Sequence, residues 1–192
     1  HGNPLSQSHV VEDVDSVGGC LGVIALCDLG GNRLAESGGK SLKIWDLNTY
    51  TLIKTLLANK GFISEIIRID DSRLCCAKSN DLQIWNIDTA ECLTTLPAIN
   101  HILCVMYLGN DKIVCSEGFN KNITFWCNQK EEGWVFKTNY TYSSVRSFAK
   151  VGNNLLSVEE SGIISVFDIT TFESIKILLE EPKGYASSIC AQ

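Results

Sequence analysis

The sequence predicts an all-β protein built from four similar units, and three observations support this prediction. The hexapeptide at 42–47 occurs four times, as LKIWDL (42–47), LQIWNI (82–87), ITFWCN (123–128) and ISVFDI (164–169). The aromatic residues of successive copies stand 40, 41 and 41 positions apart, at Trp45, Trp85, Trp126 and Phe167. Each copy is flanked by short apolar segments and by turns rich in Gly, Asn and Asp, with no helical period.

The first two units each contain four segments that favour strands. Runs of Ile, Leu, Val and aromatic residues suit a pleated sheet, and the turn residues between them suit hairpins. In the first unit the segments are VIALCDL (23–29), GGNRLAES (30–37), LKIWDL (42–47) and TLIKTLL (51–57). In the second they are SEIIRID (64–70), DDSRLCCAKS (70–79), LQIWNI (82–87) and ECLTTLP (91–97).

The last two units repeat the same order of turn and strand. In the third unit the segments are LCVMYL (103–108), GNDKIVCSE (109–117), ITFWCN (123–128) and WVFKTNY (134–140). In the fourth they are VRSFAKV (145–151), GNNLLSVEE (152–160), ISVFDI (164–169) and ESIKILL (173–179). We therefore expect four antiparallel sheets of four strands each.

The third strand of each unit is apolar on both faces. In the first unit, Leu42 and Ile44 lie on one face, and Trp45 and Leu47 lie on the other. Such a strand belongs to a sheet that is packed between two neighbouring sheets. Antiparallel units of about 40 residues that stack face to face are the blades of a β-propeller.

With these repeats the chain resembles the WD-repeat β-propeller family. The Trp-Asp dipeptide itself stands at Trp45-Asp46 and is replaced by related pairs in the other three units. The resemblance covers residues 20–192 and predicts blades at about 20–59, 60–99, 100–142 and 143–183, with a partial blade at 184–192. Residues 1–19 form a tail that includes a candidate closing strand. The resemblance implies a larger propeller of which these blades are a part.

The chain also departs from the family pattern. The Gly-His pair that precedes the first strand is missing, and His101 is only a loose counterpart. The Asp expected before the third strand is replaced, by Gly39, Ser79, Asn120 and Ser161. We therefore expect the family's buried His–Asp network to be absent and stability to depend mainly on apolar packing.

Composition limits the compartment and the partners. A net charge of −6 over 192 residues disfavours broad binding to nucleic acid or to anionic membranes. The nine cysteines contain no CxxC pair and mostly lie in apolar runs, so we expect reduced, buried thiols in a cytoplasmic or otherwise intracellular protein. No apolar stretch approaches the length of about 18 residues that spans a bilayer.

No arrangement of residues in the sequence indicates catalysis. A Cys–His pair would need His101 beside Cys104 or Cys115, and no zinc spacing or phosphate loop is present. We expect no catalytic residue, metal or cofactor, and a non-catalytic protein-interaction scaffold or adaptor. The alternative is a quinoprotein-like propeller enzyme. Its usual Thr-Gly-x-x-x-Trp signature is absent, and the absorbance of a bound cofactor would distinguish the two classes.

The resemblance implies that partners bind to loops at one rim of the propeller. Aromatic and cationic residues gather in the loops expected there, a composition that is typical of binding hot spots. The candidate binding residues are Lys60, Phe62, His101, Phe119, Lys121, Tyr140, Tyr142, Lys183 and Tyr185. For each aromatic the alternative is inward packing over the strand ends.

We expect other proteins or peptides as partners, and neither nucleic acid nor membrane. Four blades and a partial one leave an apolar face to be covered. We therefore also expect the chain either to self-associate or to bind a further segment that completes the propeller.

Overall fold

The computed structural model describes residues 23–38, 41–57, 62–118, 122–129, 131–141 and 144–179 of the chain. Within these ranges the backbone forms strands and turns, and no helix occurs that could span a membrane. The strands form four sheets, each of four strands that pair antiparallel in the order of the chain. The predicted all-β fold of four four-stranded units is therefore confirmed. We refer to these sheets as blades 1 to 4.

The sixteen strands of the described residues follow the predicted segments closely. Blade 1 contains β1 (Val23–Gly30), β2 (Arg33–Gly38), β3 (Ser41–Asp46) and β4 (Thr51–Leu57). Blade 2 contains β5 (Ile63–Arg68), β6 (Arg73–Lys78), β7 (Asp81–Asn86) and β8 (Cys92–Pro97). Blade 3 contains β9 (Ile102–Gly109), β10 (Lys112–Glu117), β11 (Asn122–Gln129) and β12 (Gly133–Thr141). Blade 4 contains β13 (Val145–Val151), β14 (Asn154–Glu159), β15 (Ile164–Asp168) and β16 (Ser174–Leu179). The predicted tail at 1–19 and partial blade at 184–192 lie outside the described residues.

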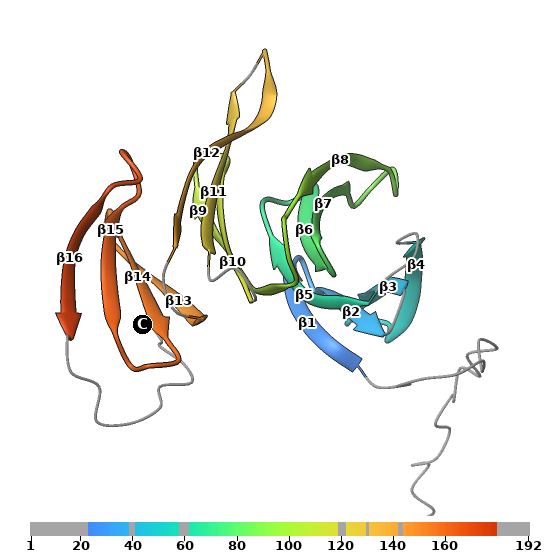
Figure 1. The fold of residues 1–192 in the computed structure, drawn as a ribbon. Coiled ribbons are helices and arrows are strands. Elements are labelled where there is room, and N and C mark those ends of the chain that lie inside the picture. The colour runs from blue at the N-terminus through green and yellow to red at the C-terminus, as the bar shows by residue number, and fades with distance from the viewer. Residues whose placement is uncertain are drawn as a thin grey trace, which may run out of the picture.

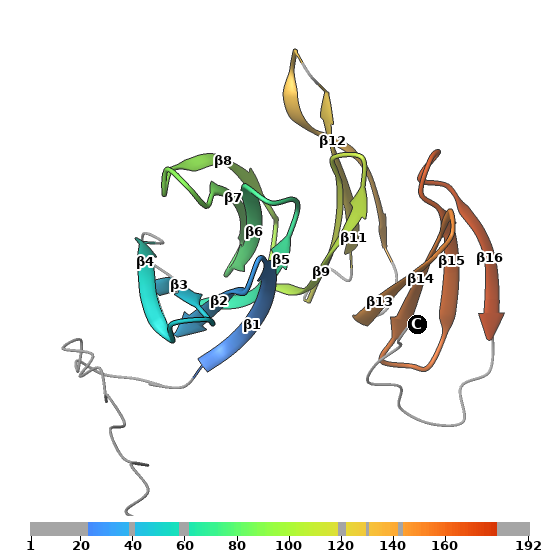
Figure 2. The same ribbon diagram turned by 180° about the vertical axis from the view of Figure 1, so that it is seen from behind.

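The blades stand one after another in an arc that stays open over the described residues (Figures 1 and 2). The first strand of each blade contacts the first strand of the next blade along the chain. The fourth strand of each blade lies at the opposite edge of its sheet. Successive blades therefore meet along their first strands.

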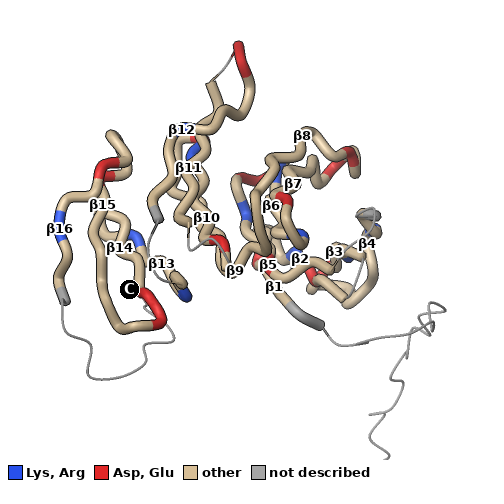
Figure 3. The backbone as a smooth tube through the Cα atoms, viewed as in Figure 1, with Lys and Arg blue, Asp and Glu red and all other residues tan. Residues whose placement is uncertain are grey.

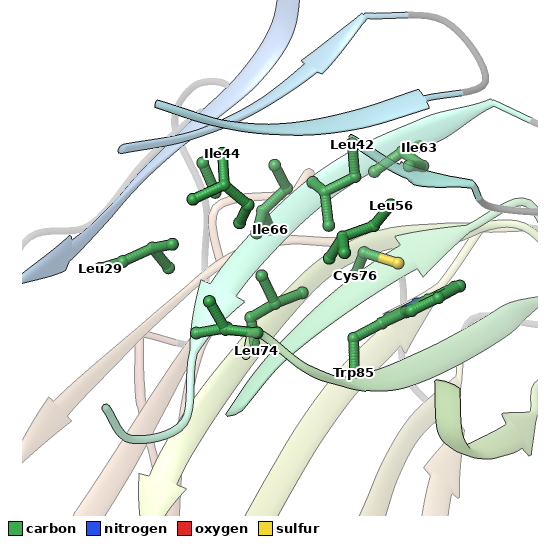
Figure 4. Close-up of a cluster of buried hydrophobic side chains, with 11 residues drawn as sticks. Leu29, Leu42, Ile44, Leu56, Ile63, Ile66, Leu74, Cys76 and Trp85 are labelled. Atoms are coloured by element: carbon green, nitrogen blue, oxygen red, sulfur yellow. The ribbon is translucent and has the colours of Figure 1, made fainter. Parts of the chain in front are cut away.

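The hydrophobic core is divided into three clusters, and each cluster lies between two successive blades. Between blades 1 and 2, Leu42, Ile44 and Leu56 lie opposite Leu74 and Trp85 (Figure 4). The cluster between blades 2 and 3 and the cluster between blades 3 and 4 are built from the corresponding positions. The face of each blade that carries the tryptophan or Phe167 packs onto the blade before it. This arrangement explains why the third strands are apolar on both faces.

The four repeated aromatic residues are buried to different extents. Trp85, Trp126 and Phe167 are buried in the three clusters between blades. Trp45 is half-buried, and its indole Nε1 donates a hydrogen bond to Glu36 at 2.7 Å. Trp45 differs because blade 1 is the first described blade, so no described blade precedes it.

The aspartate or asparagine that follows the aromatic residue shapes the turn into the fourth strand. The side-chain oxygens of Asp46, Asn86 and Asp168 each accept hydrogen bonds from the backbone N–H groups two and three residues later, at 2.6 to 3.4 Å. These N–H groups lower the pKa of the Asp46 and Asp168 carboxyls, because they stabilise the charged form. The Asp or Asn of the repeat is therefore a turn-forming residue.

Two β-bulges recur in every blade. Each first strand has an irregularity near its start, between Ile63 and Glu65 in blade 2 and at the corresponding positions elsewhere. Each fourth strand has one opposite the repeated aromatic residue. Bulges increase the local twist of a strand, and we infer that this repeated pair shapes each blade for stacking on its neighbours.

In blades 1 to 3, a cation at the start of the second strand contacts the next blade, at the rim that carries the first-to-second-strand turns. Arg33 of blade 1 donates to the backbone oxygen of Asp71 in blade 2 at 2.9 Å. Arg73 of blade 2 bonds Asp111 of blade 3 at 2.7 Å, and Lys112 of blade 3 donates to Ile169 O of blade 4 at 2.8 Å. Blade 4 has Asn154 at this position. Polar contacts thus supplement the apolar clusters at all three interfaces.

Candidate protein-binding rim

The rim opposite these cations carries the loops that lead into each first strand and the turns between second and third strands. We call it the loop rim. Its described parts are Phe62, residues 79–80, residues 98–101, Gly118, Ser144 and residues 160–163. The best-described loop is 98–101, which joins blade 2 to blade 3.

Backbone hydrogen bonds fix the loop 98–101 to both blades. The N–H groups of Ala98 and Ile102 donate to the oxygens of Asn80 and Ser79 in blade 2, at 2.7 and 3.0 Å. In blade 3, the N–H of Gly118 donates to His101 O at 2.8 Å. The loop therefore has one defined conformation although it lies at the surface.

A buried carboxylate holds the centre of the same loop. Glu117, at the end of β10, is 1% exposed. Its Oε2 accepts hydrogen bonds from the N–H groups of Ile99 and Asn100, both at 3.1 Å, and its Oε1 accepts from the Thr124 hydroxyl at 3.0 Å. Burial of a polar group is tolerated when hydrogen bonds replace its hydration. Glu117 thus connects the loop 98–101 to blade 3 through hydrogen bonds, as the Asp missing before the third strand would be expected to do.

The loop 98–101, held in this way, has an exposed apolar side chain at its tip. Ile99 is 67% exposed and Phe62 is 49% exposed, and His101 is also exposed. The side-chain nitrogen of Asn100 is buried and has no hydrogen-bond partner in the described part of the chain. The loop rim around blades 2 and 3 therefore combines exposed apolar side chains with an imidazole.

The structure places the nine sequence-predicted binding residues in three different situations. Phe62 and His101 are exposed at the loop rim. Tyr140 is half-buried: its ring packs against Phe125 and Phe167, and its hydroxyl donates to Phe172 O at 2.9 Å. We therefore leave Tyr140 out of the proposed surface, because its ring and hydroxyl serve the packing of blades 3 and 4. The other six lie outside the described residues, namely Lys60, Phe119, Lys121, Tyr142, Lys183 and Tyr185.

Sequence reasoning missed Ile99, Asn100 and Glu117. Ile99 lies in the segment PAINH, from which only the histidine was selected. Glu117 lies before Asn120, which is the position where the family pattern has its Asp. An acidic residue at the end of a second strand, next to a loop, was the signal that could have identified it.

Most of the described cysteines are thiols of low reactivity. All seven described cysteines are free, and Cys75, Cys76, Cys104 and Cys115 are buried. Burial raises the pKa of Cys76 and of Cys104 to about 12. The Sγ atom of Cys104 lies 3.0 Å from Oγ of Ser116, and the two side chains share a hydrogen bond between neutral groups. Cys92 differs from the expectation of burial, since it is exposed on β8.

The positions of basic residues and of possible metal ligands also describe this part of the molecule. Lys and Arg are distributed over the four sheets of the described chain (Figure 3). Within the same residues, no group of three or more His, Cys, Asp or Glu side chains is placed to hold a metal ion.

The fold and the comparisons with known proteins lead to the same class. Four consecutive four-stranded antiparallel sheets are consistent with blades of a WD-type propeller, in agreement with the predicted fold class. The chain is 24% identical to WD repeat-containing protein 89 homolog of Dictyostelium discoideum over 179 residues, which cover 87% of this chain and 47% of that protein. It is 25% identical to Autophagy-related protein 16 of Arabidopsis thaliana over 178 residues, which cover 90% of this chain and 34% of that protein. The chain thus spans less than half the length of either relative. No family model matches the sequence.

Proposed function

We propose that this chain is a non-catalytic protein-interaction scaffold or adaptor of WD-repeat type, which binds proteins or peptides through its loop rim inside the cell. The observation that carries the proposal is the loop 98–101. Its backbone is fixed to two blades and to Glu117, while Ile99 stays exposed at its tip. A preorganised apolar residue loses little conformational entropy when a partner covers it.

The kinds of residue around this loop support the same role. Phe62 and His101 are exposed on either side of blade 2, at the two loops that lead into β5 and β9. Aromatic side chains are enriched in protein interfaces, and a few such residues usually provide most of the binding energy. Similarity to a WD-repeat protein favours protein partners in general.

The proposal is tested by affinity capture from the source cell, with three versions of the protein compared quantitatively. Ile99→Asp places a charge on the tip of the loop and should reduce recovery of specific partners at least tenfold. Val151→Asp is the matched control, because Val151 is also an exposed β-branched residue, 53% exposed, at the opposite rim. It should leave recovery unchanged.

A second measurement uses the purified chain mixed with a purified partner. The Kd of a purified partner should rise for Ile99→Asp and for Phe62→Ala while the melting temperature of each variant stays near that of the native chain. If Val151→Asp weakens binding and the two loop-rim variants do not, the binding surface lies elsewhere and the proposal fails.

A further inference from the structure

Glu65 joins the first strands of blades 2 and 3 through its side chain. It follows the bulge of β5, and its Oε2 accepts a hydrogen bond from the backbone N–H of Val105 in β9 at 2.7 Å. The side chain is partly buried. A carboxylate therefore forms part of the contact between these two blades.

At the other two interfaces an uncharged hydroxyl near the end of the second strand makes a side-chain link to the next blade. Ser37 of blade 1 donates to Ile63 O of blade 2 at 3.4 Å, and Ser116 of blade 3 donates to Val145 O of blade 4 at 3.0 Å. The corresponding residue of blade 2 is Ala77, which has no hydroxyl and is the cross-strand partner of Glu65. Glu65 thus provides the side-chain link that Ala77 cannot provide.

The groups that face Glu65 do not neutralise its charge. They are two thiols, Cys75 of β6 and Cys104 of β9, whose pKa values burial raises. Arg146 of β13, which also acts on Cys104, is exposed and pairs with Glu160 at 2.9 Å. Among the described residues no Lys, Arg or His forms an ion pair with Glu65. An ionised Glu65 is therefore a partly desolvated charge with one hydrogen bond.

We propose that Glu65 links proton binding to the packing of blades 2 and 3, so that the packed arrangement is more stable when the carboxyl is protonated and less stable when it ionises. In the protonated state one oxygen still accepts from Val105, and no charge is desolvated. In the ionised state the same contact keeps a charge away from water, which favours separation of the two blades at this point.

The direction in which the pKa of Glu65 is shifted agrees with the geometry. Burial raises the pKa of Glu65 from 4.5 to about 7, although the Val105 N–H acts in the opposite direction. Because the folded chain holds the proton more tightly than the unfolded chain, this contribution to stability is complete below about pH 4.5. It decreases as the pH rises through about 7 and then stays constant. The direction is opposite to that of a carboxylate in an ion pair.

The test compares the native chain with Glu65→Gln at pH 5.5 and pH 8. For the native chain, the unfolding equilibrium constant should rise on the order of tenfold or more between these pH values, because a pKa unit corresponds to a factor of ten. Glu65→Gln keeps an acceptor for Val105 and has no charge, so it should remove this change and be the more stable protein at pH 8. Glu36→Gln is the control. It alters a carboxylate that bonds Trp45 within blade 1, and Glu65 remains intact, so the change should persist.

Hydrogen exchange locates the effect. After correction for intrinsic rates, amides of β9 in the native chain should exchange faster at pH 8 than at pH 5.5, relative to those of β2 and β3. Glu65→Gln should abolish this difference. An unaltered pH dependence in Glu65→Gln, or a difference spread equally over all blades, would contradict the proposal.

Discussion

Trp85 tests the packing of blade 2 on blade 1 at the scale of a single residue. It is 7% exposed, in the cluster between blades 1 and 2, whereas Trp45 occupies the same position of its own blade and is half-buried. Trp85→Ala should lower the free energy of unfolding by about 3–5 kcal/mol, the usual cost of truncating a buried large aromatic side chain. Trp45→Ala should cost clearly less. Denaturant unfolding of both variants measures this order, and equal losses would be evidence against the assignment of blade faces.

The cysteines provide a second prediction at the scale of single residues. With native protein, a thiol reagent should label Cys92 first among the described cysteines, because it is exposed while Cys75, Cys76, Cys104 and Cys115 are buried. In denaturant all nine should react. Peptide mapping by mass spectrometry identifies the labelled sites. Rapid native labelling of Cys75 or Cys115 would show that the cluster between blades 2 and 3 is open.

Individual residues were predicted with unequal success, for physical reasons. The buried positions Trp85 and Trp126 followed from their phase in the repeat. For Tyr140 the sequence left inward packing open as the alternative, and the choice depends on the space beside Phe125 and Phe167 in the folded chain. The contacts of Glu117 and Glu65 could not be predicted, because their hydrogen-bond partners are distant in the sequence or belong to another blade.

At the scale of elements, the contact between blades 3 and 4 includes one buried hydroxyl. Ser116 Oγ donates to Val145 O at 3.0 Å and lies beside Cys104. Ser116→Ala leaves this carbonyl without its side-chain donor, so we expect a loss of about 1–2 kcal/mol in the free energy of unfolding. Ser41→Ala is the matched control, since its hydroxyl donates to Gly38 O within one hairpin and is half-buried. Equilibrium unfolding should rank Ser116→Ala as the more damaging change. The reverse order would show that this contact contributes little.

The order of strands and turns could be predicted because it depends on local patterns. Apolar runs, turn residues and a period near 40 residues are all visible in the sequence. The repeated bulges were not predicted. A bulge shifts the pairing register by one residue, and that shift depends on the neighbouring strand as much as on the strand itself.

At the scale of the whole molecule, apolar residues are exposed on both end blades of the arc. Blade 1 exposes Leu26 and Leu52, and blade 4 exposes Ile175, Ile177 and Leu178. The fourth strands of blades 2 and 3 also expose Leu93 and Phe136, whereas Ile66, the counterpart of Leu26, is buried between blades. Apolar surface of this extent favours association with another protein surface. We therefore propose that the end blades of this chain are covered, either by a second copy or by a further segment of propeller.

The central claim is that apolar packing of each blade on the next builds the molecule, and light scattering of the isolated 192-residue chain tests it most directly. The account predicts a mass of two or more chains, or a single chain that binds an apolar dye strongly at its end blades. Ile177→Lys and Leu26→Lys should lower the association or the dye binding. A monomer with little dye-detectable apolar surface, unaffected by these substitutions, would contradict the account.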